Sequence, residues 1–133
     1  MKEPAGRMLY AILCYNSEAT VCAWPKEHED SVMAKLDAVQ DKLVREGRLG
    51  PVARLMPTTA ATTLRKDREP AVVIDGPFAE TKEQLLGFYV IDCRDLEHAI
   101  ETARDLGKAN PGGSFEIRPL ALFKPGTVST SAS

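Results

Sequence analysis

The sequence has few of the residues that build metal centres, disulfide frameworks or cofactor sites. It holds two histidines, and its three cysteines, an odd number, include no Cys-x-x-Cys pair. Neither a metal site nor a disulfide framework is therefore predicted. A Gly-rich phosphate loop is also missing, so we expect no nucleotide, and nothing in the sequence indicates another cofactor.

Long apolar runs and a strong net charge are missing as well. The longest apolar run, residues 8–14, is far too short to span a bilayer, and the first residues (MKEPAGR) lack the pattern of a signal peptide. With a net charge of −2, neither nucleic acid nor a membrane surface is an expected partner. The sequence predicts a cytoplasmic protein with one domain at 7–123, a flexible leader at 1–6 and a disordered tail at 124–133.

Apolar periodicity predicts two helices. Between about residues 25 and 46, four apolar residues recur at spacings of four, three and four and so form one buried stripe, Val32, Leu36, Val39 and Leu43. The second helix runs to about residue 107, and Asp95 is its expected N-cap. The buried stripe of this second helix is expected to consist of Leu96, Ala99, Ile100, Ala103 and Leu106.

Extended apolar segments predict the remaining elements. The expected strands cover residues 7–15, 49–55, 86–93 and 114–123, with a hairpin at 60–65 and 71–75. This order is β-α-β, hairpin, β-α-β, which predicts an α+β fold of ferredoxin-like plan with an antiparallel sheet and two helices on one face. The first strand is apolar on both faces, so we predict that two copies pack sheet to sheet as a homodimer.

One stretch of the sequence resembles a known family. Residues 75–85 read DGPFAETKEQL, residues 87–92 read GFYVID, and ATTLR and EIRP stand at 61–65 and 116–119. Over about residues 8–120 this pattern resembles the YCII-related proteins that carry a DGPF motif, and it departs from them in Leu86, where glycine is common, and in a longer N-terminal leader. The resemblance implies a dimeric α+β barrel of ferredoxin-like subunits.

The resemblance also implies two classes of function. The DGPF branch is a group without an established reaction. Relatives in the wider superfamily include enzymes that act on small aromatic or chlorinated compounds, some with a His-Asp pair, and members of the branch are associated with extracytoplasmic-function sigma factors. One hypothesis is therefore a small-molecule-binding or enzymatic dimer with acid–base chemistry at the motif. The alternative is a non-catalytic regulatory or protein-interaction dimer linked to such sigma factors.

Asp75 is the first candidate for a catalytic residue. It follows the apolar residues 71–74 at a strand end, where a rigid element can aim its carboxylate into a cleft. Gly76 permits close backbone approach, Pro77 fixes the turn, and Phe78 offers an apolar wall that would raise the pKa of Asp75. The alternative is structural, because Asp, Gly and Pro are also ordinary turn residues.

His28 is the candidate proton partner of Asp75. It lies four residues before Val32, so it should extend the helical stripe and face the sheet. The alternative is a histidine satisfied by a backbone carbonyl. His98 is expected to be a surface residue.

Charged and aromatic residues complete the candidate ligand site. The planar guanidinium groups of Arg65 and Arg118 suit a carboxylate or phosphate of a ligand. The equal alternative is an ion pair with Asp or Glu at the subunit interface. Glu80 and Lys82 add charge beside the motif, or form a solvated pair. The full predicted ligand-binding set, in which the aromatic residues line an apolar cleft, is Gly76, Pro77, Phe78, Glu80, Lys82, Arg65, Tyr10 and Phe88.

Overall fold

A four-stranded antiparallel sheet organises the chain. The computed structural model describes residues 8–128, so the predicted leader and the last five residues of the predicted tail lie outside the described residues. The order of the strands is β2-β5-β1-β6, as in a ferredoxin-like sheet, and β1, the strand that is apolar on both faces, is an inner strand. The four strands are β1 (Met8–Asn16), β2 (Leu49–Arg54), β5 (Gln84–Cys93) and β6 (Ser114–Pro119).

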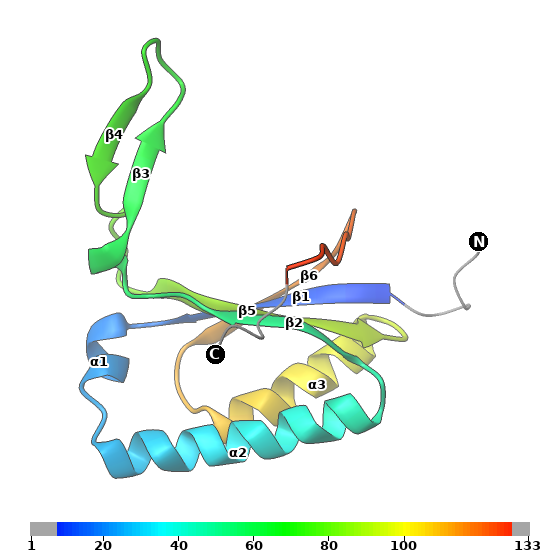
Figure 1. The fold of residues 1–133 in the computed structure, drawn as a ribbon. Coiled ribbons are helices and arrows are strands. Elements are labelled where there is room, and N and C mark those ends of the chain that lie inside the picture. The colour runs from blue at the N-terminus through cyan, green and yellow to red at the C-terminus, as the bar shows by residue number, and fades with distance from the viewer. Residues whose placement is uncertain (1–7, 129–133) are drawn as a thin grey trace.

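Two long helices cover one face of this sheet, which confirms the predicted arrangement (Figure 1). Helix α2 (Lys26–Arg45) begins directly after Pro25, and Gly47, with a φ of 70°, follows its end. Helix α3 (Leu96–Ala109) is capped as predicted, because the Asp95 carboxylate accepts a hydrogen bond from the His98 amide at 2.9 Å. His98 itself is half-buried.

The core lies between the helices and the sheet. Tyr10 and Ile12 of β1 stand beside Ile91 and Tyr89 of β5, and all four side chains face the helices. Each large side chain buried here stabilises the fold by about 1.5–3 kcal/mol. The core residues that the two helices contribute include Val32, Leu36, Leu43, Ala99, Ala103 and Leu106.

The predicted buried stripe of α3 is wrong at Leu96, and Ile100 is only half-buried. Leu96 is 51% exposed, whereas Thr102 and Ala109 are buried. Leu96 lies in the first turn, at the margin of a stripe that centres on Ala99 and Leu106, so it does not reach the core. Spacing alone placed it on the buried face.

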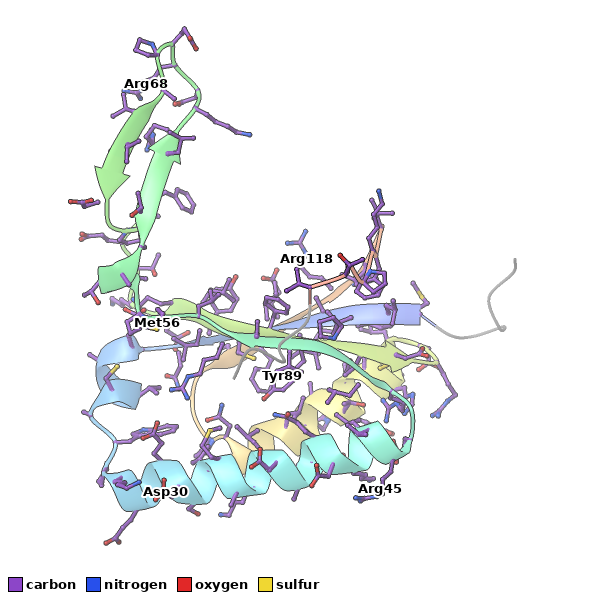
Figure 2. All side chains as sticks on the ribbon, in the orientation of Figure 1. Asp30, Arg45, Met56, Arg68, Tyr89 and Arg118 are labelled. Carbon is purple, nitrogen blue, oxygen red and sulfur yellow. The ribbon has the colours of Figure 1, made fainter. Side chains whose placement is uncertain are left out.

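The other face of the sheet carries apolar side chains but no described helix (Figure 1). The register pairs Ala11 with Val90 and Leu13 with Phe88, and these side chains point away from α2 and α3. Arg118 of β6 is also on this side, as Figure 2 shows. The sheet is therefore apolar on both faces, although helices of its own chain cover one.

The predicted hairpin projects from the face of the sheet that the helices leave uncovered (Figure 1). Strands β3 (Thr62–Arg65) and β4 (Val72–Asp75) pair only with each other, and all four residues of β4 are exposed. Met56 lies at the base of the hairpin and Arg68 near its tip (Figure 2). The first strand is shorter than predicted because residues 58–60 form a 3₁₀ turn, η1 (Thr58–Ala60).

A carboxylate joins the base of the hairpin to the body. Glu18 lies in the short helix α1 (Glu18–Cys22), and its two carboxylate oxygens accept hydrogen bonds from the Thr58 amide and the Thr58 hydroxyl, both at 2.7 Å. The Glu18 amide in turn donates to the side-chain oxygen of Gln84 at 2.9 Å. Helix α1 was not predicted, because five residues with none buried leave no apolar periodicity to detect.

The last strand is shorter than expected. We predicted it over residues 114–123, but β6 ends at Pro119. Proline has no amide hydrogen and so suits the end of a ladder. Beyond it, the Leu120 amide still donates to the Leu9 carbonyl at 2.9 Å, and residues 121–128 form no helix or strand.

Candidate functional site

A cavity opens between the sheet and the part of α2 from Glu29 to Gln40. Its volume is about 170 Å³, and β1, β2, β5, α1 and α2 all contribute to its walls. A dry apolar cavity of about 150 Å³ is large enough to hold benzene, so this one matches a single ring. The residues that line the cavity include Cys14, Glu29, Gln40, Arg54, Gly87 and Tyr89.

Gly87 and Trp24 shape this cavity. Gly87 of β5 has no side chain, and a Cβ atom there would overlap the Ala53 carbonyl oxygen on β2. The two strands therefore pair closely, and no side chain from position 87 enters the cavity. At one end, Trp24 stands between α1 and α2, with its ring 4.5 Å from the ring of His28 in an edge-to-face contact.

The polar groups inside the cavity are uncharged. Tyr89 is hydrogen-bonded to Gln40, and burial, reinforced by neighbouring Cys14, raises the pKa of Tyr89 to about 12. Figure 2 shows Tyr89 between the sheet and the helices. Burial also raises the pKa of Cys14 to about 11. At neutral pH the cavity thus offers a phenol, an amide and a thiol, and no thiolate nucleophile.

An ion pair stands at the mouth of the cavity. Arg54 at the end of β2 and Glu29 in the first turn of α2 both line it, with 3.9 Å between Nη2 and Oε2. Their side chains are 64% and 49% exposed, so the pair is solvated. The site is therefore mainly apolar inside, with a few uncharged polar groups, and is charged at its entrance.

The structure does not bring Asp75 and His28 together within one chain. Asp75 ends β4 in the hairpin, on the side of the sheet opposite α2, where His28 lies (Figure 1). The prediction that His28 faces the sheet is wrong: the residue is exposed. The cause is its place in the first turn of α2, where its ring packs against Trp24 instead of the core.

The first residues of the motif continue the ladder of the hairpin. Asp75 pairs with Thr62, and the Gly76 amide donates to the Ala61 carbonyl at 2.8 Å. The Gly76 carbonyl accepts from the Thr63 hydroxyl at 2.8 Å, and the φ of Gly76 is 103°, which favours glycine. This segment therefore has a structural role in closing the hairpin.

The other predicted ligand residues of the hairpin and motif do not line the cavity. Phe78 is 80% exposed, and Glu80 and Lys82 are exposed as well, while Pro77 is half-buried. Arg65 lies 4.0 Å from Asp67 in the hairpin loop. They form a surface, separate from the cavity.

Tyr10 and Phe88 lie on opposite faces of the sheet. Tyr10 is buried under the helices, whereas Phe88 is paired with Leu13 on the uncovered face. The predicted cleft of Tyr10, Phe78 and Phe88 is therefore not formed in one chain. Phe88 is nevertheless one of the residues that line the cavity, as part of β5.

Sequence reasoning missed the residues that define the cavity. Cys14, Gln40, Arg54 and Tyr89 come from four different elements and share no motif. The available signals were weak: a glycine within an apolar strand, at Gly87, and a charged residue at a strand end. Neither specifies a gap between packed elements.

Two kinds of feature are absent from residues 8–128. No group of three or more His, Cys, Asp or Glu side chains there is arranged to hold a metal ion. None of the helices formed by these residues has the length and apolarity needed to cross a membrane.

Comparison with known proteins places the chain in a family. It is similar to an uncharacterized protein of Rhizobium meliloti (strain 1021), with 63% identity over 122 residues that cover 91% of this chain and 98% of that protein. The family model for the YCII-related domain matches residues 8–124, a span that takes in the sheet, both long helices and the hairpin. The chain therefore belongs to the YCII-related domain family.

Proposed function

We propose that this protein binds a small, mainly apolar molecule in the cavity between α2 and the sheet. The observation that carries the proposal is the cavity itself, with apolar walls and a neutral phenol–amide pair inside. Ligand sites commonly combine apolar walls with a few placed polar groups. The volume of about 170 Å³ suits one ring or a short branched chain.

The proposal assigns binding and no reaction. The groups inside the cavity, Tyr89, Gln40 and Cys14, are uncharged at neutral pH and supply no general base. Proton transfer between Asp75 and His28 is not included, because those residues lie on opposite sides of the sheet and outside the cavity.

Filling the cavity tests this function. Val32→Phe adds a ring to a buried residue of the lining, whereas Val44→Phe makes the same change at an exposed position of the same helix. With benzyl alcohol as the probe in ligand-observed NMR, we expect Val44→Phe to bind like the wild type and Val32→Phe to lose binding. Cys14→Met is a second, milder filling variant.

Circular dichroism establishes that the filling variants are folded. If folded Val32→Phe and Cys14→Met both bound the probe as well as Val44→Phe, the cavity would not be the binding site. Failure of benzyl alcohol, toluene and benzoate to bind the wild type would overturn the function.

We also propose that two copies form the dimer expected for an α+β barrel. The uncovered face of the sheet carries Ala11, Leu13 and Phe88, and the hairpin on the same side exposes Val73 to 66%. A two-stranded hairpin alone is marginally stable in water, so a covering partner is favourable. A second copy brings a matching apolar face.

Sedimentation tests the dimer. We expect the wild type to sediment as a dimer at micromolar concentration, Val73→Asp to sediment as a monomer, and Val44→Asp on the solvent side of α2 to remain a dimer. A monomeric wild type would contradict the proposal.

A second candidate function is a protein-interaction module in the cytoplasm, with an extracytoplasmic-function sigma factor as its partner. Phe78 favours it, because a side chain that is 80% exposed beside the projecting hairpin suits a hydrophobic anchor. A purified sigma factor of this class should bind the wild type and not Phe78→Ala. Absence of binding to the wild type would reject this candidate.

A further inference from the structure

We infer that the ligand of the cavity is an apolar carboxylic acid whose carboxylate binds Arg54 at the mouth. This inference rests on the proposed function, since it requires the cavity to be a ligand site. It adds the chemical class of the ligand and the residue that selects it.

Arg54 is placed to meet a ligand that projects from the cavity. It is the last residue of β2, its backbone is paired with Gly87 of β5, and it lines the cavity while its side chain is 64% exposed. Its guanidinium group is permanently charged and can donate two parallel hydrogen bonds to a carboxylate. A ligand with its body inside therefore presents its head group to Arg54.

The present partner of Arg54 is easily displaced. At 3.9 Å from Arg54, the Glu29 carboxylate is beyond hydrogen-bonding distance, and solvated pairs of this kind are weak. Glu29 also lies in the first turn of α2, where the helix dipole stabilises a carboxylate without Arg54. A ligand carboxylate can replace it and form the closer, bidentate contact.

The charge distribution favours an acid over an amine. Among the described residues that line the cavity, Arg54 and Glu29 are the charged ones. A cationic ligand would have to bind Glu29 while lying beside Arg54 and the positive end of α2. The Tyr89–Gln40 pair, deeper in the site, is suited to a neutral polar substituent such as a hydroxyl group.

Three probes of one shape test the class. Benzoate, benzyl alcohol and benzylamine are titrated into the wild type and into two variants. Arg54→Gln removes the proposed ligand contact. Arg45→Gln is the control, because Arg45 lies at the far end of α2 (Figure 2). We expect benzoate to bind about tenfold more tightly than benzyl alcohol in the wild type and in Arg45→Gln. In Arg54→Gln we expect weaker benzoate binding, so that the preference for benzoate over benzyl alcohol is lost. Glu29→Gln should tighten benzoate binding.

The outcomes separate this inference from the proposed function. If benzyl alcohol bound but benzoate bound no better, or if Arg54→Gln left benzoate affinity unchanged, the carboxylate class would be wrong and the apolar site would stand. If benzylamine bound most tightly, Glu29 would be the selecting residue and the inference would fail. If none of the probes bound, the proposed function would fail with it.

Discussion

The body of the protein and the hairpin are stabilised by different kinds of contact. In the body, Ile12, Ile91 and Leu106 are fully buried between sheet and helices, whereas every residue of β4 in the hairpin is exposed. The body is stabilised by its own core, while the hairpin is held by its backbone ladder and by the contacts of Glu18 at its base. Apolar content alone does not make a core, since the hairpin is also rich in valine, leucine and isoleucine.

The largest expected difference is that between matched leucines in the two regions. Leu106→Ala removes a fully buried side chain and should lower the free energy of unfolding by about 2–5 kcal/mol, because it leaves a cavity in the core. Leu64→Ala in the exposed hairpin should cost no more than about 0.5 kcal/mol in the monomeric protein. Urea denaturation measures both.

Protein concentration sharpens this first test. If Leu64 packs in the proposed dimer, the cost of Leu64→Ala should rise with protein concentration, while that of Leu106→Ala should not. Equal costs for both variants at the lowest concentration would mean that Leu64 in the hairpin is packed as firmly as Leu106 in the core.

A smaller effect is expected at the junction of the two regions. Glu18→Gln replaces the carboxylate that accepts both hydrogen bonds from Thr58, and we expect a loss of about 1–2 kcal/mol in local stability. Amide hydrogen exchange should accelerate in residues 58–76 and stay unchanged in α3. Glu101→Gln, an exposed glutamate on α3, serves as the control.

Uniform acceleration of exchange over the body would contradict this account. It would mean that Glu18 stabilises the whole domain instead of anchoring the hairpin.

Alkaline pH should affect the body and leave the hairpin ladder largely unchanged. Folding raises the pKa of Cys14 from 9.0 to about 11 and that of Tyr89 from 10.0 to about 12, since burial disfavours both anions. The folded state therefore retains protons that the unfolded state releases. The stability gained is complete below about pH 9 and is lost as the pH rises through 11 and 12.

Urea denaturation midpoints measured between pH 8 and pH 11 should therefore fall as the pH rises. Tyr89→Phe and Cys14→Ala should each flatten the decline, because each removes one titrating group. A slope that neither variant changed would show that other groups cause it.

The sequence predicted the structure better where side chains are buried in a core. In the body, the spacing of Val32, Leu36 and Leu43 and the apolar strands β1 and β5 sufficed, because periodicity records which face is buried. The prediction from periodicity failed at His28. Helical spacing shows on which face of the helix a residue lies, but it does not show how far the core extends along that face.

The candidate site was much harder to predict than the fold. The motif at residues 75–85 is conspicuous, but its first residues close the hairpin. The cavity depends on how Tyr89, Gln40 and Arg54 are placed by three separate elements, and no local pattern records that relation. A site formed by tertiary packing becomes visible only when the elements are assembled.

The contact of Glu18 with Thr58 has a consequence for the protein as a whole. Helix α1 holds the base of the hairpin through Glu18 and supplies Val21 to the cavity wall, so one short helix touches both the proposed ligand site and the hairpin that belongs to the proposed subunit contact. A ligand that moves α1 also moves the anchor of the hairpin. Occupancy of the cavity and association of the subunits are then thermodynamically linked, and each alters the affinity of the other by the same factor.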